Sequence, residues 1–351
     1  MPVVQEDLLR NISRAICCAT GVPTEDAHIV ADHVVNNHLA GHDSHGTWFL
    51  PGYSRSMKEN YRLWEDREVL RENATLQIID GHGANGIVAC TKAVDLAVEK
   101  AREATFGFIG LRNVSHIGRL GDYPPRIAEQ GMLGMVWLNG GGLFMVPFGS
   151  ADRRLRPEPI SFAAPRRNGA PFMLDMTMTV VAGGKIEQKI VRDEPLPDGW
   201  VVDQSGNHVT DCHKYRDSEA NGVLPLGGLQ FGHKGFGLAM MVEMLVGPLS
   251  HAGCTKGDGG GGGVMVLAID IEAFTDLNTY KDEVEGLRDW VCSARPLPGF
   301  NKIYAPGEIE EETKERRIKE GIDLPEKVWG DIIKTANELG VKLPAEVASV
   351  I

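Results

Sequence analysis

The feature that most restricts the fold is an alternation of strand-like and helix-like segments in the first half of the chain. These segments are, in order, a strand at 75–80, an amphipathic helix at 86–104, a strand at 106–114, a short helix at 123–131 and a strand at 133–140. Strands separated by helices are typical of a sheet with helices packed against it. The chain is therefore expected to contain a sheet lobe of the α/β or α+β class.

The segments on either side of this alternation complete the expected order of elements. Helices are expected in 4–40 (two of them), at 50–61, at 234–247 as a buried helix, and from 306 to 341, where the chain is rich in charge. Further strands are expected at 160–165, at 172–176, within 199–211 and at 264–270. The last strand follows the glycine run of 257–263, which on its own is equally typical of a flexible loop. Helical sequence thus lies at both ends of the chain, with the sheet segments between.

Length, charge and cysteine content exclude several classes of protein. A chain of 351 residues is long for one core, so two lobes are expected. A net charge of −12 argues against broad contact with nucleic acid or anionic membranes. The six cysteines form no CxxC pair and are expected to be reduced thiols. With no signal-peptide pattern and no apolar run long enough to span a bilayer, the predicted location is the cytoplasm.

A glycine motif at the first strand-to-helix turn resembles a dinucleotide fingerprint but fails its second test. Gly81, Gly83 and Gly86 have the G-x-G-x-x-G spacing and follow a strand. The Rossmann pattern also requires an acidic residue near the end of the next strand, and that strand ends in Leu111-Arg112-Asn113. We interpret the motif as a glycine-rich turn and not as a Rossmann site.

The turn "GHDSHG" at 41–46 offers three interpretations. His42, Asp43 and His45, with His38 one helical turn earlier, are residue types that bind metals. The segment also has the composition of a polar turn after a helix that ends at Gly41. In the third interpretation His45 transfers a proton and Ser44 orients it, because imidazole titrates near neutral pH.

Two glycine-containing segments are suited to anionic groups. The first, 113–123, contains His116 and Arg119 beside glycines that let the backbone approach a ligand. The second, "GHKGFG" at 232–237, begins a helix, where free N–H groups and the positive helix end attract phosphate. The GxxxxGK[ST] spacing of a Walker loop is absent, so a dinucleotide phosphate fits better than a nucleoside triphosphate.

Several of these motifs, taken together and in this order, resemble the malate/L-lactate dehydrogenase family. They are "GHDSHG", "NVSHIGRLGDY", "FMLDMTMTVVAGGKI", "EPLPDGW", "PLGGLQFGHKGFGLAMMVEML" and "PGE…GIDLP". The resemblance covers nearly the whole chain and is strongest for the broad-specificity hydroxycarboxylate dehydrogenases. It implies NAD(P)-dependent oxidoreduction on a fold that is not Rossmann.

The resemblance also implies how the molecule is organised. A helical, substrate-binding lobe would combine residues 1–72 and 270–351, and residues 73–269 would form the sheet-containing cofactor lobe. The active site would lie between the lobes of a homodimer that binds a small-molecule acid. The cofactor would be NAD or NADP, with NAD slightly favoured, and no catalytic metal is expected.

The resemblance assigns roles to individual residues. His45 would be the proton donor and acceptor, Ser44 its relay partner, and Lys185 the group that polarises the substrate oxygen. The resemblance implies that related cyclic-imine reductases carry Asp at this position. Lys185 therefore favours a hydroxy or oxo substrate. The cofactor-binding positions would be His116, Gly118, Arg119, Leu120, Gly121, Asp175, Met176, Thr177, His233, Lys234, Gly307 and Glu308.

Two departures from the family pattern concern the substrate. Many members have an Arg four residues after the catalytic His, where it binds the substrate carboxylate, and this chain has Phe49 preceded by Trp48. The usual Gly-Thr-Asn-Pro is replaced by residues 156–159, which bring Arg156 and Glu158 close to the expected substrate position. Arg119 or Arg156 could therefore supply the missing cation, or the substrate could be bulkier or aromatic.

The expected reaction is reversible hydride transfer between nicotinamide and the C2 carbon of a 2-hydroxy acid, malate- or lactate-like or bulkier. One alternative is an NAD(P)H-dependent cyclic imine reductase, which the Lys185 position disfavours. Another is a catalytically silent dinucleotide-binding protein, which the unusual residues at 49 and 156–158 leave open.

Overall fold

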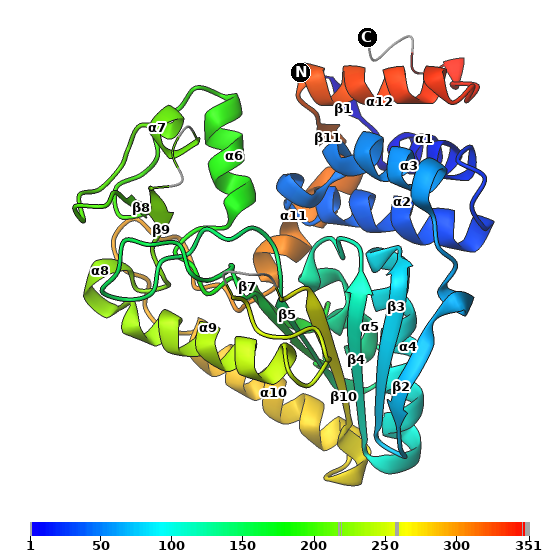
Figure 1. Cartoon of the computed structure of the whole chain (residues 1–351). Coiled ribbons are helices and arrows are strands. Elements are labelled where there is room, and N and C mark those ends of the chain that lie inside the picture. Colours follow the sequence, from blue (N-terminus) through cyan, green and yellow to red (C-terminus); the bar gives the residue numbers. More distant parts are fainter. Residues whose placement is uncertain (1, 217, 219, 257–259, 346, 348–351) are drawn as a thin grey trace.

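The computed structural model describes residues 2–216, 218, 220–256, 260–345 and 347, and its centre is a seven-stranded sheet (Figure 1). The strand order is β2-β3-β4-β10-β5-β6-β7. The strands are β2 (Glu68–Glu72), β3 (Leu76–Ala84), β4 (Phe106–Val114), β5 (Met132–Asn139), β6 (Ile160–Ala164), β7 (Phe172–Met176) and β10 (Gly263–Asp270). A mixed α/β architecture is confirmed.

The connectivity of this sheet differs from that of a Rossmann domain. Only β3 and β4 pair in parallel, through the crossover helix α4 (Gly86–Ala104). Strand β10, from much later in the chain, lies between β4 and β5 and is antiparallel to both. A doubly wound fold requires successive parallel strands, so the rejection of a Rossmann site is confirmed.

Helices cover both faces of the sheet, and the alternation of side chains along β10 decides which. Val264 and Val266 point to the face covered by α4 and by α5 (Pro124–Ala128). Met265, between them, points to the opposite face and packs with Val242 and Val246 of α9 (His233–Val246). Because successive side chains in a strand alternate, β10 is buried on both faces.

A helical bundle lies above one end of the sheet and is built from both ends of the chain (Figure 1). It contains α1 (Glu6–Cys18), α2 (Thr24–Leu39), α3 (Leu50–Asn60), α11 (Glu308–Glu320) and α12 (Glu326–Glu338). A short antiparallel ribbon of β1 (Val3–Val4) and β11 (Ile322–Asp323) joins the two ends. The helical lobe expected from both chain ends is therefore present, although β2 already belongs to the sheet at residues 68–72.

A third, smaller unit extends beside the bundle and was not expected from the sequence. It contains α6 (Gly183–Val191), α7 (Cys212–Arg216), β8 (Val201–Val202) and β9 (Gly222–Val223). Its own apolar cluster includes Ile186, Ile190, Leu196, Val201 and Cys212. Helix α8 (Gly228–Phe231) connects this unit to α9, and α10 (Leu277–Cys292), also unexpected, follows the sheet.

The helix expected to be buried, α9, exposes apolar side chains on the face away from the sheet, so the prediction of full burial is wrong for the single chain. These side chains are Leu238, Met240, Met241 and Met244.

Of the glycine run at 257–263, residues 257–259 lie outside the described part of the chain. None of the described helices has both the length and the apolar character needed to cross a membrane.

Candidate active site

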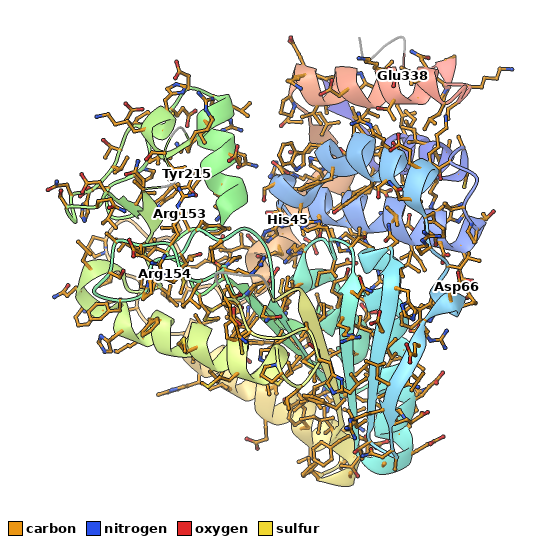
Figure 2. All side chains as sticks on the ribbon, viewed as in Figure 1. His45, Asp66, Arg153, Arg154, Tyr215 and Glu338 are labelled. Atoms are coloured by element: carbon orange, nitrogen blue, oxygen red, sulfur yellow. The ribbon has the colours of Figure 1, made fainter. Side chains whose placement is uncertain are left out.

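The turn at 41–46 lies where the helical bundle, the sheet and the small unit meet, and it carries His45 (Figure 2). Helix α2 ends at Leu39, and Gly41 follows with a φ of +82°, as expected of a glycine that ends a helix. Gly46 packs against the buried His38 ring, and a Cβ there would lie 2.2 Å from His38 Nδ1. The same Nδ1 accepts a hydrogen bond from the Thr47 N–H (2.9 Å). Only glycine fits this second bend.

Helix α11 holds this turn from the opposite end of the sequence. Arg317 forms an ion pair with Asp43 (2.5 Å) and donates to the His38 carbonyl oxygen. His42 Nε2 lies 3.1 Å from Glu310 Oε1. His42 and Asp43 thus have partners on α11, and this arrangement does not favour the metal interpretation.

The His45 ring is half-buried and is held in a defined orientation. Ser44 Oγ lies 3.2 Å from His45 Nδ1, and Asn37 donates to the His45 carbonyl oxygen (3.1 Å). Burial, together with the smaller effects of the neighbouring His116 and His33, lowers the pKa of His45 to about 3. The imidazole is therefore neutral at pH 7 and can accept a proton.

An aromatic wall faces His45, and we define it as Trp48, Phe49, Tyr53 and His116. Phe49 is central, with ring centroids 4.8 Å from Trp48, 5.5 Å from Tyr53 and 5.3 Å from His116. The His116 and His45 rings are stacked at 6.2 Å. Tyr53 Oη lies 2.6 Å from His116 Nδ1 in a hydrogen bond, and the Trp48 indole N–H donates to the Ser44 carbonyl oxygen (2.8 Å). The expected substrate residues Trp48 and Phe49 therefore lie directly beside His45.

A buried histidine of α2 positions the predicted cofactor loop. His33 Nε2 accepts from the Arg119 N–H (3.1 Å), and its Nδ1 lies 3.1 Å from Asp122 Oδ2. Burial alone would raise the pKa of Asp122, but the bonds from His33 and Arg126 outweigh it and lower that pKa to about 2. Gly118 is required next to this ring, since a Cβ there would lie 2.0 Å from His33 Nε2.

The end of β7 contacts this loop, and both segments contain residues that the resemblance assigns to cofactor binding. Asp175 Oδ2 accepts from the Gly121 N–H (3.1 Å) and lies 2.8 Å from Arg119 Nε. Leu120 is buried beneath the loop, while Met176 and Thr177 continue the strand edge. Because Arg119 is buried and paired with Asp175, it is not a free cation for a substrate carboxylate.

The beginning of α6, which carries Lys185, packs against the turn at 41–46. Gly184 packs on Ser44, where a Cβ would lie 2.8 Å from Ser44 Cβ. The Lys185 side chain, on the next residue, is exposed and has no hydrogen-bond or ion-pair partner in the described part of the chain. The structure thus brings Ser44, His45 and the first turn of α6 together.

The other predicted cofactor residues lie on two neighbouring segments. Backbone hydrogen bonds run from Leu226 to Met178 (2.8 Å) and from Gly235 to Leu226 (3.2 Å), so the start of α9, with exposed His233 and Lys234, adjoins the end of β7. Before α11, the Pro306 carbonyl oxygen accepts from the Met173 N–H (3.2 Å). The Gly307 backbone, with a φ of +97°, packs on Met173, but the Glu308 carboxylate takes protein partners, Arg288 (2.7 Å) and the Ala305 N–H (3.0 Å).

Arg156 and Glu158 hold loops together. Each guanidinium nitrogen of Arg156 has a partner, namely the carbonyl oxygens of Gly141 and Gly260 and the Thr255 hydroxyl. Glu158 is fully buried, and burial together with the adjacent Glu243 raises its pKa to about 9. A neutral Glu158 can share its proton with Glu243. Substrate contact by these two residues stays a prediction, and their observed partners indicate a structural role.

Comparison with known proteins decides the family. The model of the malate/L-lactate dehydrogenase family matches residues 4–333. The chain belongs to this family. It is 34% identical to a malate dehydrogenase of Pyrococcus abyssi, over 97% of this chain and 95% of that protein. It is 33% identical to an L-sulfolactate dehydrogenase of Methanocaldococcus jannaschii, over 92% and 93%. The crystal structure of malate dehydrogenase from Entamoeba histolytica superposes with a TM-score of 0.92 at 25% identity, covering 97% of this chain and 99% of that one.

The family membership predicted from the motifs is thus confirmed, but sequence reasoning missed three residues of the site. Tyr53 lies one helical turn after Phe49 on α3, and that spacing was a usable signal. His33 lies one turn of α2 before Asn37, which bonds to the His45 carbonyl oxygen, so this spacing was a signal of the same kind. Gly184 had none, because its contact with Ser44 joins segments that are distant in the sequence.

Gly184→Ala tests the contact between α6 and the turn at 41–46. The added methyl group would overlap Ser44, so Lys185 should move away from His45. A displacement near 1 Å costs about 10²-fold in rate, and we expect dehydrogenase activity to fall by about that factor while the melting temperature changes little. Gly286→Ala is the matched control, because a Cβ there meets nothing within 4 Å. Equal activity of the two variants would contradict the contact.

Proposed function

We propose that this protein is an NAD(P)-dependent dehydrogenase that interconverts a 2-hydroxy acid and its 2-oxo acid. The observation that carries the proposal is the neutral, half-buried His45, oriented by Ser44, whose own neighbour is Gly184 in the first turn of α6, one residue before Lys185. A base and a cation next to each other are what removal of a proton from a hydroxyl group requires. The dehydrogenase relatives support the same class of reaction.

The donor groups around His45 fit a dinucleotide. The loop from His116 to Gly121 and the edge at Asp175–Thr177 would hold one part of it, and the first turn of α9 with His233 and Lys234 would hold its phosphates. Helix N-termini with adjacent cations are suited to pyrophosphate. The bound nicotinamide supplies hydride transfer, which no amino-acid side chain can perform.

His45 handles the proton. When His45 Nδ1–H donates to Ser44 Oγ, the lone pair of Nε2 is free to face the substrate. In oxidation Nε2 takes the hydroxyl proton while C2 loses its hydride, and in reduction the same atom returns the proton to the carbonyl oxygen. Ser44 therefore acts by fixing the tautomer and the orientation of the ring.

Lys185 is the cation that we assign to the substrate. Arg119 and Arg156 are engaged by protein partners, whereas Lys185 has none in the described residues. In a 2-hydroxy acid the C2 oxygen and one carboxylate oxygen lie close enough for a single ammonium group to contact both. Lys185 would thus stabilise charge on the reacting oxygen and also hold the carboxylate.

The aromatic wall is our ground for proposing a class of substrate. Phe49 presents an apolar ring beside His45, and Tyr53 and His116 extend that surface. A second carboxylate, as in malate, would lose hydration here without gaining a cation. We therefore propose a substrate whose C3 group is aromatic or bulky and apolar.

The exposed face of α9 supports a homodimer. Met240, Met241 and Met244 lie on this face, and Leu229 and Phe231 of α8 continue it. An apolar surface of this kind on a sheet-covering helix is typical of contact between two copies.

The six free cysteines suit a reducing compartment, which supports a cytoplasmic location.

The first test is NADH and NADPH oxidation with a panel of 2-oxo acids, using wild type and His45→Ala. We expect turnover by wild type and a loss of about 10²-fold or more in the variant. Because the His45 pKa is lowered, kcat/KM for oxidation should not lose activity near the ordinary histidine value, and its acid limb should lie below about pH 5. Turnover of a cyclic imine but of no 2-oxo acid, or cofactor binding without turnover, would contradict the proposal.

Phe49→Ala tests the class of substrate. Removing the ring should lower kcat/KM for phenylpyruvate by about tenfold, the value of one good aromatic contact, and change kcat/KM for pyruvate much less. Phe274→Ala is the control, since Phe274 is exposed and its ring partner is Phe106. A parallel loss for both acids would show that Phe49 acts on His45 and does not select the side chain.

Met244→Glu tests the dimer. Light scattering should give twice the chain mass for wild type, and a buried carboxylate at the centre of the interface should shift the variant towards monomer. Phe274→Glu places the same charge on a distant exposed site and should stay dimeric. A monomeric wild type would refute the assignment of α9.

A further inference from the structure

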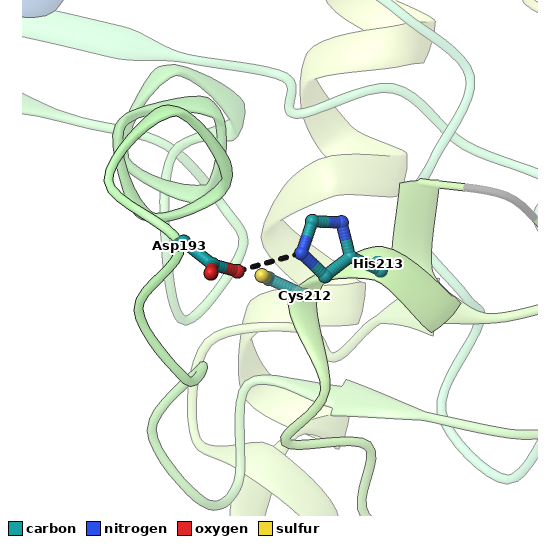
Figure 3. A group of neighbouring side chains, drawn as sticks. All are labelled: Asp193, Cys212 and His213. Atoms are coloured by element: carbon teal, nitrogen blue, oxygen red, sulfur yellow. Dashed lines mark hydrogen bonds and ion pairs between the residues drawn. The ribbon is translucent and has the colours of Figure 1, made fainter.

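Three side chains of metal-binding type converge in the small unit, away from the catalytic turn. Asp193, Cys212 and His213 each offer one ligand atom, and these atoms lie within 4.8 Å of one another (Figure 3). In the described part of the chain no other group of three or more such residues converges in this way. We propose that this trio binds a transition-metal ion of the Zn²⁺ class. The proposal does not depend on the dehydrogenase function.

The backbone around the trio fixes all three side chains. Asp193 ends α6 in the left-handed region, with a φ of +54°, and its N–H donates to the Ile190 carbonyl oxygen (3.1 Å). Asp211 accepts from the N–H groups of His213 (2.9 Å) and Lys214 (3.2 Å) and so fixes the first turn of α7. The two segments are held by the apolar cluster that α6 and α7 share. The trio is thus positioned before any ion arrives.

The donor set matches borderline-soft ions. Thiolate, imidazole and carboxylate are the three kinds of side chain that bind Zn²⁺ in proteins, whereas Ca²⁺ and Mg²⁺ take oxygen ligands. His213 Nε2 and Asp193 Oδ1 are already 2.7 Å apart. Cys212 is buried at the edge of the apolar cluster, while His213 and Asp193 are exposed. Three protein ligands on one side leave a fourth position for water.

A hollow beside the trio gives an ion access. It has a volume of about 560 Å³, and His213 lines it together with Asp203, Asp211, His208 and Lys214. The two aspartates lower the local electrostatic potential, which favours entry of a divalent cation. His208 is paired with Asp198 (2.6 Å) and is not part of the trio.

One contact opposes binding and defines the proton balance. Arg216 Nη2 lies 3.1 Å from His213 Nδ1, so the neutral ring carries its proton on Nε2 and donates it to Asp193. On metal binding through Nε2, that proton moves to Nδ1, and the contact between Nδ1 and Arg216 is lost. The Cys212 thiol releases its proton to solvent as the thiolate–metal bond forms. Affinity should therefore rise with pH.

The ion would join the end of α6 to α7. Lys185 lies at the other end of α6, so an occupied site would stiffen the helix that presents this lysine to the catalytic turn. We expect Zn²⁺ to raise the melting temperature of the wild type, because an ion that binds only the folded state stabilises it by mass action.

The test is zinc binding by the full chain, with four proteins treated first with a chelator. They are wild type, Cys212→Ser, His213→Gln and the control His208→Gln, titrated with Zn²⁺ against a chromophoric indicator. Changes around metal ligands cost about 10–100-fold in affinity, so loss of a ligand should weaken binding by about 100-fold or more. We expect one tight site per chain in wild type and in His208→Gln, and its loss in the other two.

A second readout uses wild type alone and does not depend on how the variants fold. Alkylation of Cys212, followed by mass spectrometry of its peptide, should slow when Zn²⁺ is added, while labelling of the partly exposed Cys18 and Cys292 should not. Unchanged labelling of Cys212, or equal zinc affinity in wild type, Cys212→Ser and His213→Gln, would overturn the proposal. Loss of the tight site in His45→Ala, titrated in the same way, would place the ion at the turn at 41–46 and would also overturn the proposal.

Discussion

The ion pair between Arg317 and Asp43 is the interaction on which the rest of the site depends. It joins α11, near the end of the chain, to the turn that follows α2, and the same guanidinium group donates to the His38 carbonyl oxygen. The turn is otherwise a polar, glycine-rich segment whose conformation would not be unique. With Arg317 on one side and His38 packed against Gly46 on the other, Ser44 and His45 have one orientation towards α6. The turn to which we assign the proton transfer is therefore positioned by both ends of the chain.

Local sequence patterns predicted the elements well wherever the pattern itself decides the structure. The strands at β6 and β7 and the helices α2, α3 and α4 were expected within a few residues, because periodicity, caps and glycines are local signals. The order of motifs predicted the family, which the comparisons confirm. What local patterns could not give is the insertion of β10 between β4 and β5, since pairing between residues so far apart in the sequence leaves no periodic trace.

The same limit applies to the site. His45, Ser44 and Phe49 are close in the sequence, and their proximity was predictable. The ion pair of Arg119 with Asp175 and the full burial of Glu158 beside Glu243 depend on tertiary contacts, and they change what these residues can do. An arginine that the sequence offers to a substrate is already paired with a carboxylate in the fold. Lys185, by contrast, keeps its charge available because no acidic side chain lies against it in the described residues.

Burial of His45 has opposite consequences for the two directions of the proposed reaction. A neutral imidazole is ready to accept a proton, so oxidation of the hydroxy acid needs no prior change of charge. Reduction needs the imidazolium, which burial disfavours. A substrate carboxylate beside the ring would add a negative charge in the same poorly hydrated space, and an opposite charge within a few ångströms raises a histidine pKa. The proton that reduction requires would therefore be stabilised chiefly when the oxo acid is bound. In this way the substrate itself would adjust the pKa of the group that acts on it, and the apolar wall at Phe49 strengthens the effect because it keeps water away from both charges.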